Sequence, residues 1–251
     1  MKLSFCLITK NEEANLPRCL TSVAPLADEI IVLDTDSTDR TVQIAREYGA
    51  SVFVEEWKGY GAQKNSAAQK ASHPWVFSID ADEEISPALA GQITQWKKRE
   101  DQNPTDAWEI CRCVFYEGKW IRHGDWYPDW VVRIFHREHS HFTEVKVHES
   151  VTVPGQKCKL PGDLYHYTYK DYADQLERID KYAHLWAGEK ARQGKSSSPL
   201  APHLHSLSRF LRGYIIKGGF RDGKLGAQIA LANAHEVFLK YKLLQEKTRH
   251  P

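Results

Sequence analysis

Trp75-Val-Phe-Ser-Ile-Asp-Ala-Asp-Glu-Glu84 joins a short apolar run to four carboxylates. The apolar run predicts a buried strand. Residues i and i+2 of a strand share a face, so Asp80 and Asp82 would point the same way if the strand geometry continues. Two like charges this close repel, and burying them requires a compensating cation or donor. Because Mg²⁺ prefers oxygen ligands and leaves positions open for phosphate, the pair predicts a divalent-metal site for a diphosphate. A solvated acidic turn that caps the helix after Pro87 is the simpler alternative.

Strands and helices alternate through the residues that precede this stretch. We expect strands at 3–8, 29–33 and 51–54, and helices at 16–24, at 42–48 before Gly49, and at 62–71. This alternation predicts right-handed βαβ crossovers and a mostly parallel sheet. Ligands of such sheets bind outside the carboxyl ends of the strands, where 9–12, 34–39 and 80–84 all fall. Three polar clusters are therefore expected at one edge of the sheet.

Composition limits the class of protein. The 34 Lys and Arg nearly balance the 33 Asp and Glu, so no global field favours a nucleic-acid partner. Five cysteines without framework spacing suit a reducing compartment. Lys10, Glu12 and Glu13 interrupt the first apolar run too early for a signal peptide, and no run reaches the length of a membrane span. We expect a cytoplasmic protein that is soluble or lies on a membrane surface.

Four motifs follow one another along the first third of the chain. They are Ser-Phe-Cys-Leu-Ile-Thr-Lys-Asn-Glu at 4–12, Ile-Val-Leu-Asp-Thr-Asp-Ser-Thr-Asp-Arg-Thr at 31–41, Gly-Ala-Gln-Lys-Asn at 61–65, and Ile-Asp-Ala-Asp-Glu at 79–83. In order and spacing they resemble the motifs of the family 2 inverting glycosyltransferases with the GT-A fold. The stretches 126–129, 133–135, 147–149 and 209–223 are similar to the bacterial lipopolysaccharide inner-core glucosyltransferases that attach a β-1,4-linked glucose to heptose. One departure is Asp36, where the family usually has Gly; Asp tolerates left-handed backbone better than most residues.

The resemblance implies an α/β fold of GT-A type over residues 1–160 and a C-terminal helical region over 161–251. It implies transfer of a hexose, with UDP-glucose as the donor, to a lipopolysaccharide core or another lipid-linked saccharide. Thr9, Glu12 and Asp34 would surround the uracil and ribose, and Asp80 would lie near the ribose and the metal. For Asp34 alone, a helix N-cap without a ligand is the alternative.

Two further residues are assigned to the diphosphate and its metal. Asp82 is expected to bind a divalent cation, Mg²⁺ or Mn²⁺, which would stabilise the charge on the leaving nucleoside diphosphate. Lys64 could face the diphosphate as a point charge. A solvated lysine is the alternative for Lys64.

Inverting transfer also needs a base near the acceptor hydroxyl, on the side opposite the leaving group. The candidates are Asp125, Asp129, Glu144 and Glu149. We choose Glu149 because it ends an alternating strand, and the adjacent His148 could contact the metal or the diphosphate. A strand-end ion pair is the alternative for this position, and Asp129 is the second choice as base.

Three histidines, His136, His139 and His141, invite a zinc interpretation. Their spacing lacks a supporting carboxylate or cysteine pattern, so the sequence does not favour a zinc site there.

The last third of the chain has helical patterns. We expect a helix at 172–191, a linker at 194–199, and an apolar helical stripe from His203 to Ile216. Between His203 and Lys224, five Lys or Arg and one Asp give a net charge of 5 − 1 = +4. Such a segment could lie on an anionic membrane surface. A helix packed under the catalytic domain would explain the stripe but not the charge.

Two other functions stay open at this level. A nucleotidyltransferase could use a similar sheet, but Thr9-Lys-Asn-Glu12 lacks the Gly-rich, basic signature expected after the first strand. The second is a non-catalytic, membrane-associated module that binds nucleotide sugars. Binding without turnover would identify it.

Overall fold

The computed structural model describes residues 1–100, 102–144, 149–169 and 171–249. The chain forms two compact units. The first consists of Met1–Arg112 and Asp129–His166, and the second of Cys113–Pro128 and Tyr167–Pro251. The chain thus passes between the units three times. The last crossing lies close to the boundary expected at 160/161, whereas the segment 113–128 was expected in the first domain.

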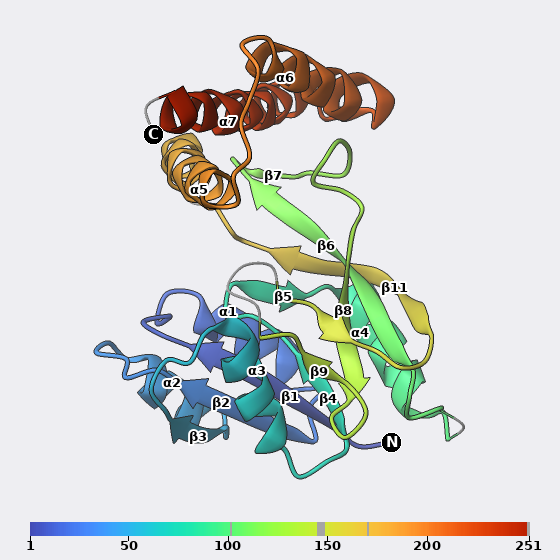
Figure 1. Ribbon diagram of the computed structural model, residues 1–251. Coiled ribbons are helices and arrows are strands. Elements are labelled where there is room, and N and C mark those ends of the chain that lie inside the picture. Colours follow the sequence, from blue (N-terminus) through green and yellow to red (C-terminus); the bar gives the residue numbers. More distant parts are fainter. Residues whose placement is uncertain (101, 145–148, 170, 250–251) are drawn as a thin grey trace. The chain divides into compact units, whose positions relative to one another are not determined.

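The sheet of the first unit has a parallel and an antiparallel half (Figure 1). Its strands are β1 (Leu3–Thr9), β2 (Glu29–Asp34), β3 (Ser51–Val54), β4 (Trp75–Ser78), β5 (Glu83–Ile85), β6 (Ala107–Tyr116), β8 (Asp129–His136) and β11 (Lys157–His166). The order is β3-β2-β1-β4-β8-β6-β11-β5. Strands β3, β2, β1 and β4 pair in parallel, as predicted. Strand β8 is antiparallel to both β4 and β6, and β11 is antiparallel to β5.

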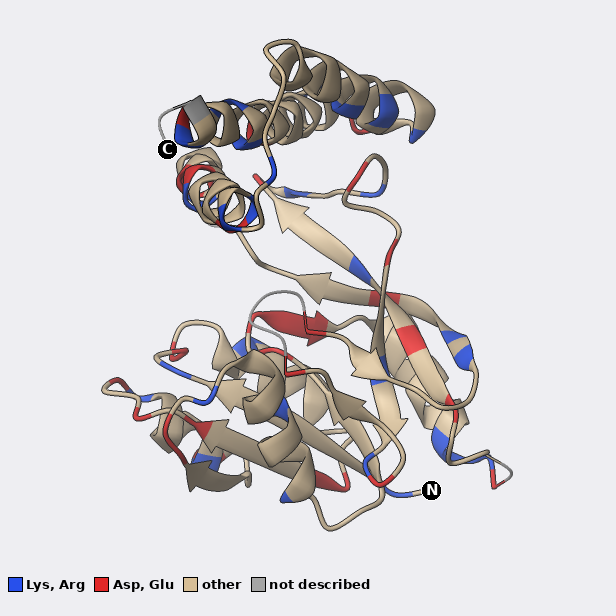
Figure 2. Cartoon of the chain, in the orientation of Figure 1, with Lys and Arg blue, Asp and Glu red and all other residues tan. Residues whose placement is uncertain are grey.

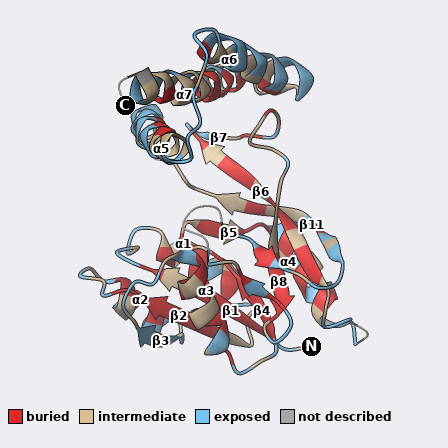
Figure 3. Cartoon of the chain, in the orientation of Figure 1, coloured by how far each residue is buried: buried red, intermediate tan, exposed pale blue. Residues whose placement is uncertain are grey.

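Both faces of the parallel half are covered by helices. Leu3, Phe5 and Leu7 of β1 belong to one core cluster, and Cys6 to another. Helices α1 (Leu16–Val23), α2 (Thr41–Glu47) and α4 (Pro87–Lys97) contribute to the first cluster, and α3 (Tyr60–Gln69) to the second. Burial on both faces explains why β1, β2 and β4 are almost continuously apolar, whereas β3 at the edge of the sheet is largely exposed (Figure 3). The observed α1, α2 and β3 agree with the predicted ranges within two residues.

The second unit is mostly helical. Helix α7 (Lys224–Arg249) packs against both α5 (Tyr172–Arg192) and α6 (Ala201–Leu211). A π-helical turn, Arg212–Ile216, extends α6, and a 3₁₀ turn follows at Gly219–Asp222. The short strand β7 (Lys119–Trp120) pairs with the end of β6. A small core of Val114, Tyr116, Ile121 and Ile229 joins the segment 113–128 to α7.

In the described part of the chain, the helices are too short or too polar to cross a bilayer.

Candidate active site

The carboxyl ends of β1 and β2 lie side by side, because Thr9 and Asp34 are paired in register. The Thr9 hydroxyl donates to Asp34 Oδ2 at 2.8 Å, and the Ser37 amide and hydroxyl donate to the same carboxylate at 2.8 and 2.6 Å. Asp34 is completely buried. Asp36, where the family usually has Gly, has a φ of +52°, so it adopts the left-handed conformation that this turn requires.

The acidic stretch is a turn between two strands. Strand β4 ends at Ser78, and the buried Glu83 carboxylate accepts from the Asp80 amide at 3.0 Å. The Glu83 amide in turn donates to the Asp80 carbonyl at 3.0 Å. This reciprocal pair closes the turn, so the strand geometry does not continue through the acidic stretch. Asp80 and Asp82 therefore face different partners instead of sharing a strand face.

Asp80 lies in a network of buried charges. Lys64 Nζ is 3.0 Å from Asp80 Oδ1, and an Arg133 guanidinium nitrogen is 2.9 Å from Oδ2. Arg133 also contacts Glu83. Burial would raise the pKa of Asp80, but the two cations outweigh it and hold this pKa well below its usual value. Burial raises the pKa of Glu83 despite the contact with Arg133.

Glu149 enters the same network through Lys64, whose Nζ lies 3.2 Å from Glu149 Oε1. Lys64, 8% exposed, thus links Asp80 to the predicted base. Residues 143, 144 and 149 lie outside strands, while the middle of the expected strand and the predicted contact His148 fall in 145–148, outside the described residues. Close packing holds this segment, because a Cβ on Gly61 would come within 2.1 Å of the Thr143 carbonyl oxygen.

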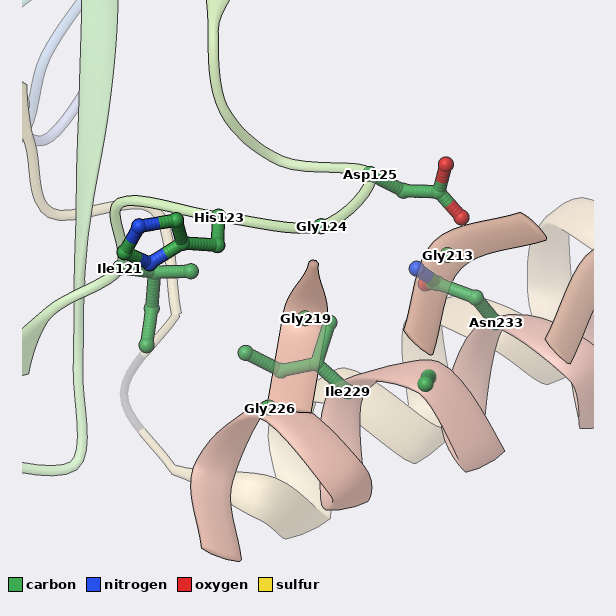
Figure 4. Close-up of a pocket in the computed structure, with 10 residues that line it drawn as sticks. Ile121, His123, Gly124, Asp125, Gly213, Gly219, Gly226, Ile229 and Asn233 are labelled. Carbon is green, nitrogen blue, oxygen red and sulfur yellow. The ribbon is translucent and has the colours of Figure 1, made fainter. Parts of the chain in front are cut away.

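The other candidate bases have different environments. Arg112 donates twice to the Oδ2 oxygen of Asp129, at 2.6 and 2.8 Å. Glu144 is exposed. Asp125 belongs to the second unit, where its buried carboxylate lies 3.1 Å from both Arg209 and Lys217. Figure 4 shows this pocket of the second unit, in which Asp125 and Asn233 reach toward Gly213. A Cβ on Gly213 would lie 2.7 Å from Asp125.

Asp82 has a histidine partner that the sequence did not reveal. His166 ends β11 in register with Glu83 of β5, and its Nε2 lies 3.3 Å from Asp82 Oδ2. Burial raises the pKa of Glu12, and repulsion from Asp82 contributes to that shift. The acidic residues of β5 stand out near this edge of the sheet in Figure 2. A partly exposed carboxylate and an imidazole in contact form a donor set that suits a divalent ion such as Mn²⁺.

Arg133 and His166 are the site residues that sequence reasoning missed. An arginine inside Trp-Val-Val-Arg-Ile-Phe is unusual in a buried strand, because a buried guanidinium needs carboxylate partners. That pattern was the available signal for Arg133. His166 offered none, because only the pairing of β11 with β5 brings it to Asp82.

Fold and site together define an α/β protein with a cluster of acidic residues at the carboxyl ends of its parallel strands, where such sheets bind ligands. Residues 4–152 match the family model described as Glycosyl transferase family 2. The match covers more than half of the chain, so this protein is a glycosyltransferase and belongs to family 2.

Individual relatives agree with this assignment. An uncharacterised glycosyltransferase of Rickettsia typhi is 31% identical over 254 residues, which cover 98% of this chain and 87% of that one. The lipopolysaccharide core biosynthesis glycosyltransferase LpsC of Rhizobium meliloti is 28% identical over 262 residues, with 97% and 94% covered. The crystal structure of S. aureus TarS 1–349 in complex with UDP-GlcNAc aligns with a TM-score of 0.51 at 17% identity, over 99% of this chain and 92% of that one. This last likeness supports the GT-A fold.

Proposed function

We propose that this glycosyltransferase moves a hexose from a UDP-sugar, UDP-glucose in the first instance, to a lipid-linked saccharide such as a lipopolysaccharide core, with inversion at the anomeric carbon. The observation that carries the proposal is the cluster of carboxylates at the ends of β1, β2 and β4. The lipopolysaccharide assignment of LpsC and the UDP-GlcNAc bound to TarS support the choice of acceptor and donor.

Charge balance supports a divalent cation, Mg²⁺ or Mn²⁺, held by Asp82 and His166. Lys64 and Arg133 oppose three carboxylates, Asp80, Glu83 and Glu149, which leaves 2 − 3 = −1. Asp82 brings the sum to −2, before a diphosphate adds more negative charge. When bound, the ion would act as a Lewis acid that stabilises charge on the departing diphosphate.

The chain's own residues would hold the donor and accept the proton. Thr9, Glu12 and Asp34 would surround the nucleoside, although a ribose contact to the buried Asp34 requires Ser37 to move. Glu149, positioned by Lys64, would take the proton from the acceptor hydroxyl as its oxygen attacks the anomeric carbon. We prefer Glu149 to Asp129 because Lys64 contacts both Glu149 and Asp80, whereas Asp129 is paired with Arg112.

The second unit exposes an apolar surface that suits contact with the membrane that would carry a lipid-linked acceptor. The segment from Leu200 to Ile215 exposes five aliphatic side chains at steps of 4, 3, 4 and 4 residues, which follow one face of a helix. The members of this exposed stripe are Leu200, Leu204, Leu207, Leu211 and Ile215, each 40–67% exposed. Figure 3 shows α6 largely in the colour of exposed residues. A helix of a globular protein turns such a face to the core, whereas a helix in a bilayer interface exposes it.

The charge beside the exposed stripe fits an anionic surface on the inner face of the cytoplasmic membrane. Arg212, Arg221 and Lys224 are exposed. Arg209 and Lys217 are both paired with Asp125, which lies outside the segment counted earlier. Adding Asp125 to Asp222 gives two acids against the five basic residues, so the net charge of this region is 5 − 2 = +3 rather than +4. Each basic residue near such a surface contributes about 1 kcal/mol. We therefore propose a cytoplasmic enzyme bound peripherally to that membrane.

Replacing the proposed metal ligand tests the donor site. We expect Asp82→Asn to weaken UDP binding in the presence of Mn²⁺ at least tenfold, measured by calorimetry, and to abolish UDP-glucose turnover. The melting temperature should change little, because Asp82 is partly exposed. Equal UDP affinity with and without Mn²⁺ in the unaltered protein would contradict the metal assignment.

Replacing the base should separate binding from chemistry. Glu149→Gln is expected to keep Mn²⁺-dependent UDP binding and to lower turnover about 10²- to 10⁴-fold, the usual contribution of a general base. Glu144→Gln is the matched control, since this exposed glutamate lies five positions away in the same segment. Equal losses in the two variants would remove Glu149 from the mechanism.

A further inference from the structure

A tight turn after β8 gathers three potential metal ligands. The amides of His139 and Ser140 both donate to the His136 carbonyl, at 3.1 and 3.0 Å. This turn brings together one donor atom each from His136, Glu138 and His139, all within 4.8 Å of one another. Glu138 thus supplies the carboxylate that sequence reasoning overlooked, whereas His141 is not part of the group.

His136 is the fixed member of the group. It is 8% exposed, and its ring packs edge-on against Trp75 with centroids 5.2 Å apart. Its Nδ1 is buried without a hydrogen-bond partner, although buried ring nitrogens are normally paired. The ring of His139 lies 4.8 Å from that of His136.

We propose that His136, Glu138 and His139 bind a transition-metal ion, with Zn²⁺ as the ion that suits two imidazoles and one carboxylate. Zinc takes His nitrogen at about 2.0–2.1 Å and carboxylate oxygen at about 2.0–2.2 Å, and water can fill a fourth position. Glu138 and His139 are exposed, so their side chains can rotate inward around the fixed His136. The neighbouring Arg137 is held on the Gln69 carbonyl at 3.1 Å.

This site is separate from the proposed active site. His136 pairs with Trp75 at the start of β4, whereas Asp80 and Asp82 follow the end of that strand. At about 3.3 Å per residue, β4 from Trp75 to Ser78 alone spans roughly 10 Å, and Asp80 and Asp82 lie beyond its end. An ion at the turn would therefore not touch the diphosphate. It would fix the turn between β8 and β9 (His141–Phe142), from which the chain continues toward Glu149.

Metal titration of the untagged full chain tests the proposal. With Zn²⁺ alone as the probe and a competing chelator, we expect one tight site that persists in Asp82→Asn. His139→Ala and Glu138→Gln should each weaken it at least tenfold, and these exposed positions should leave the fold intact. His141→Ala is the matched control and should bind as the unaltered protein does.

A second readout is independent of enzyme activity. Zn²⁺ should raise the melting temperature of the unaltered protein and of His141→Ala, but not that of His139→Ala, because a ligand of the folded state stabilises it. Co²⁺ in place of Zn²⁺ should give visible absorption bands that disappear in His139→Ala. Unchanged zinc affinity in His139→Ala, or an equal loss in His141→Ala, would overturn the proposal.

Discussion

Arg133 places a guanidinium that is 4% exposed against two carboxylates, Asp80 and Glu83. The variant Arg133→Met would leave both acids with Lys64 as the remaining cation of the network. Removing one partner of a buried ion pair costs about 3–5 kcal/mol, because an uncompensated charge stays behind. We expect a loss of this size in the free energy of unfolding measured with urea.

The control for Arg133 is Arg112, whose partner Asp129 has a side chain that is 41% exposed. Arg112→Met should cost about 1 kcal/mol or less, as exposed pairs do. Similar losses in both variants would show that burial does not set the strength of the pair around Asp80.

At the scale of single residues, the sequence assigned the acidic cluster and Lys64 to one site but did not reveal Arg133 or His166. Asp80, Asp82 and Glu12 could be assigned to one edge because they follow strands of a βαβ pattern. The contact between Asp82 and His166 joins residues 84 positions apart, through strand pairing that no local pattern encodes. The link from Lys64 to Glu149 likewise spans 85 positions.

Among the structural elements, the exposed stripe of α6 makes the most specific prediction. The double variant Leu204→Glu/Leu207→Glu should lose at least tenfold in affinity for vesicles of phosphatidylglycerol and phosphatidylethanolamine. The leucines are 62% and 56% exposed, so their removal should not lower the melting temperature. Cosedimentation and thermal unfolding measure the two quantities.

Leu185 on α5 is the matched control for the stripe, because it is 55% exposed but lies on a different helix. Leu185→Glu should bind vesicles as the unaltered protein does. If the double variant still binds vesicles, the stripe does not make the membrane contact. If the unaltered protein does not bind vesicles and the double variant loses self-association, a second copy of the chain covers the stripe.

Elements with strong periodicity were predictable, and irregular ones were not. Strand β3 and helices α1, α2 and α5 agree with the sequence patterns because turn residues and apolar spacing coincide there. Residues 143 and 144, at the start of the strand expected before Glu149, are not in a strand. Alternation of polar and apolar residues over so few positions also occurs in loops. The apolar stripe predicted from 203 to 216 divides into two groups. The rings of Phe210 and Tyr214 stack with centroids 5.3 Å apart, whereas the leucines of the stripe are exposed.

For the whole molecule, the chain passes between the two units after Arg112, after Pro128 and after His166, and these three points determine which fragments can fold alone. A chain ending at His166 would keep 113–128 but lose α7, so Val114, Tyr116 and Ile121 would lose their partner Ile229. We expect such a fragment to aggregate. Arg112 and Asp129 are paired across β6 and β8, so an Asn-Gly turn could join them in its place.

The bridged chain, 1–112 joined through Asn-Gly to 129–166, should stay monomeric and unfold cooperatively. Gel filtration and urea unfolding of the two fragments distinguish these outcomes. Equal solubility of both fragments would show that the segment 113–128 does not depend on the second unit.

The split origin of the second unit also restricts how evolution or a designer can recombine this enzyme. A gene fusion that exchanged only residues 167–251 would combine helices from one parent with the segment 113–128 from another. Asp125 would then lose its partners Arg209 and Lys217. A functional hybrid must take both segments, 113–128 and 167–251, from the same parent. We therefore expect the two segments to be exchanged together between related enzymes.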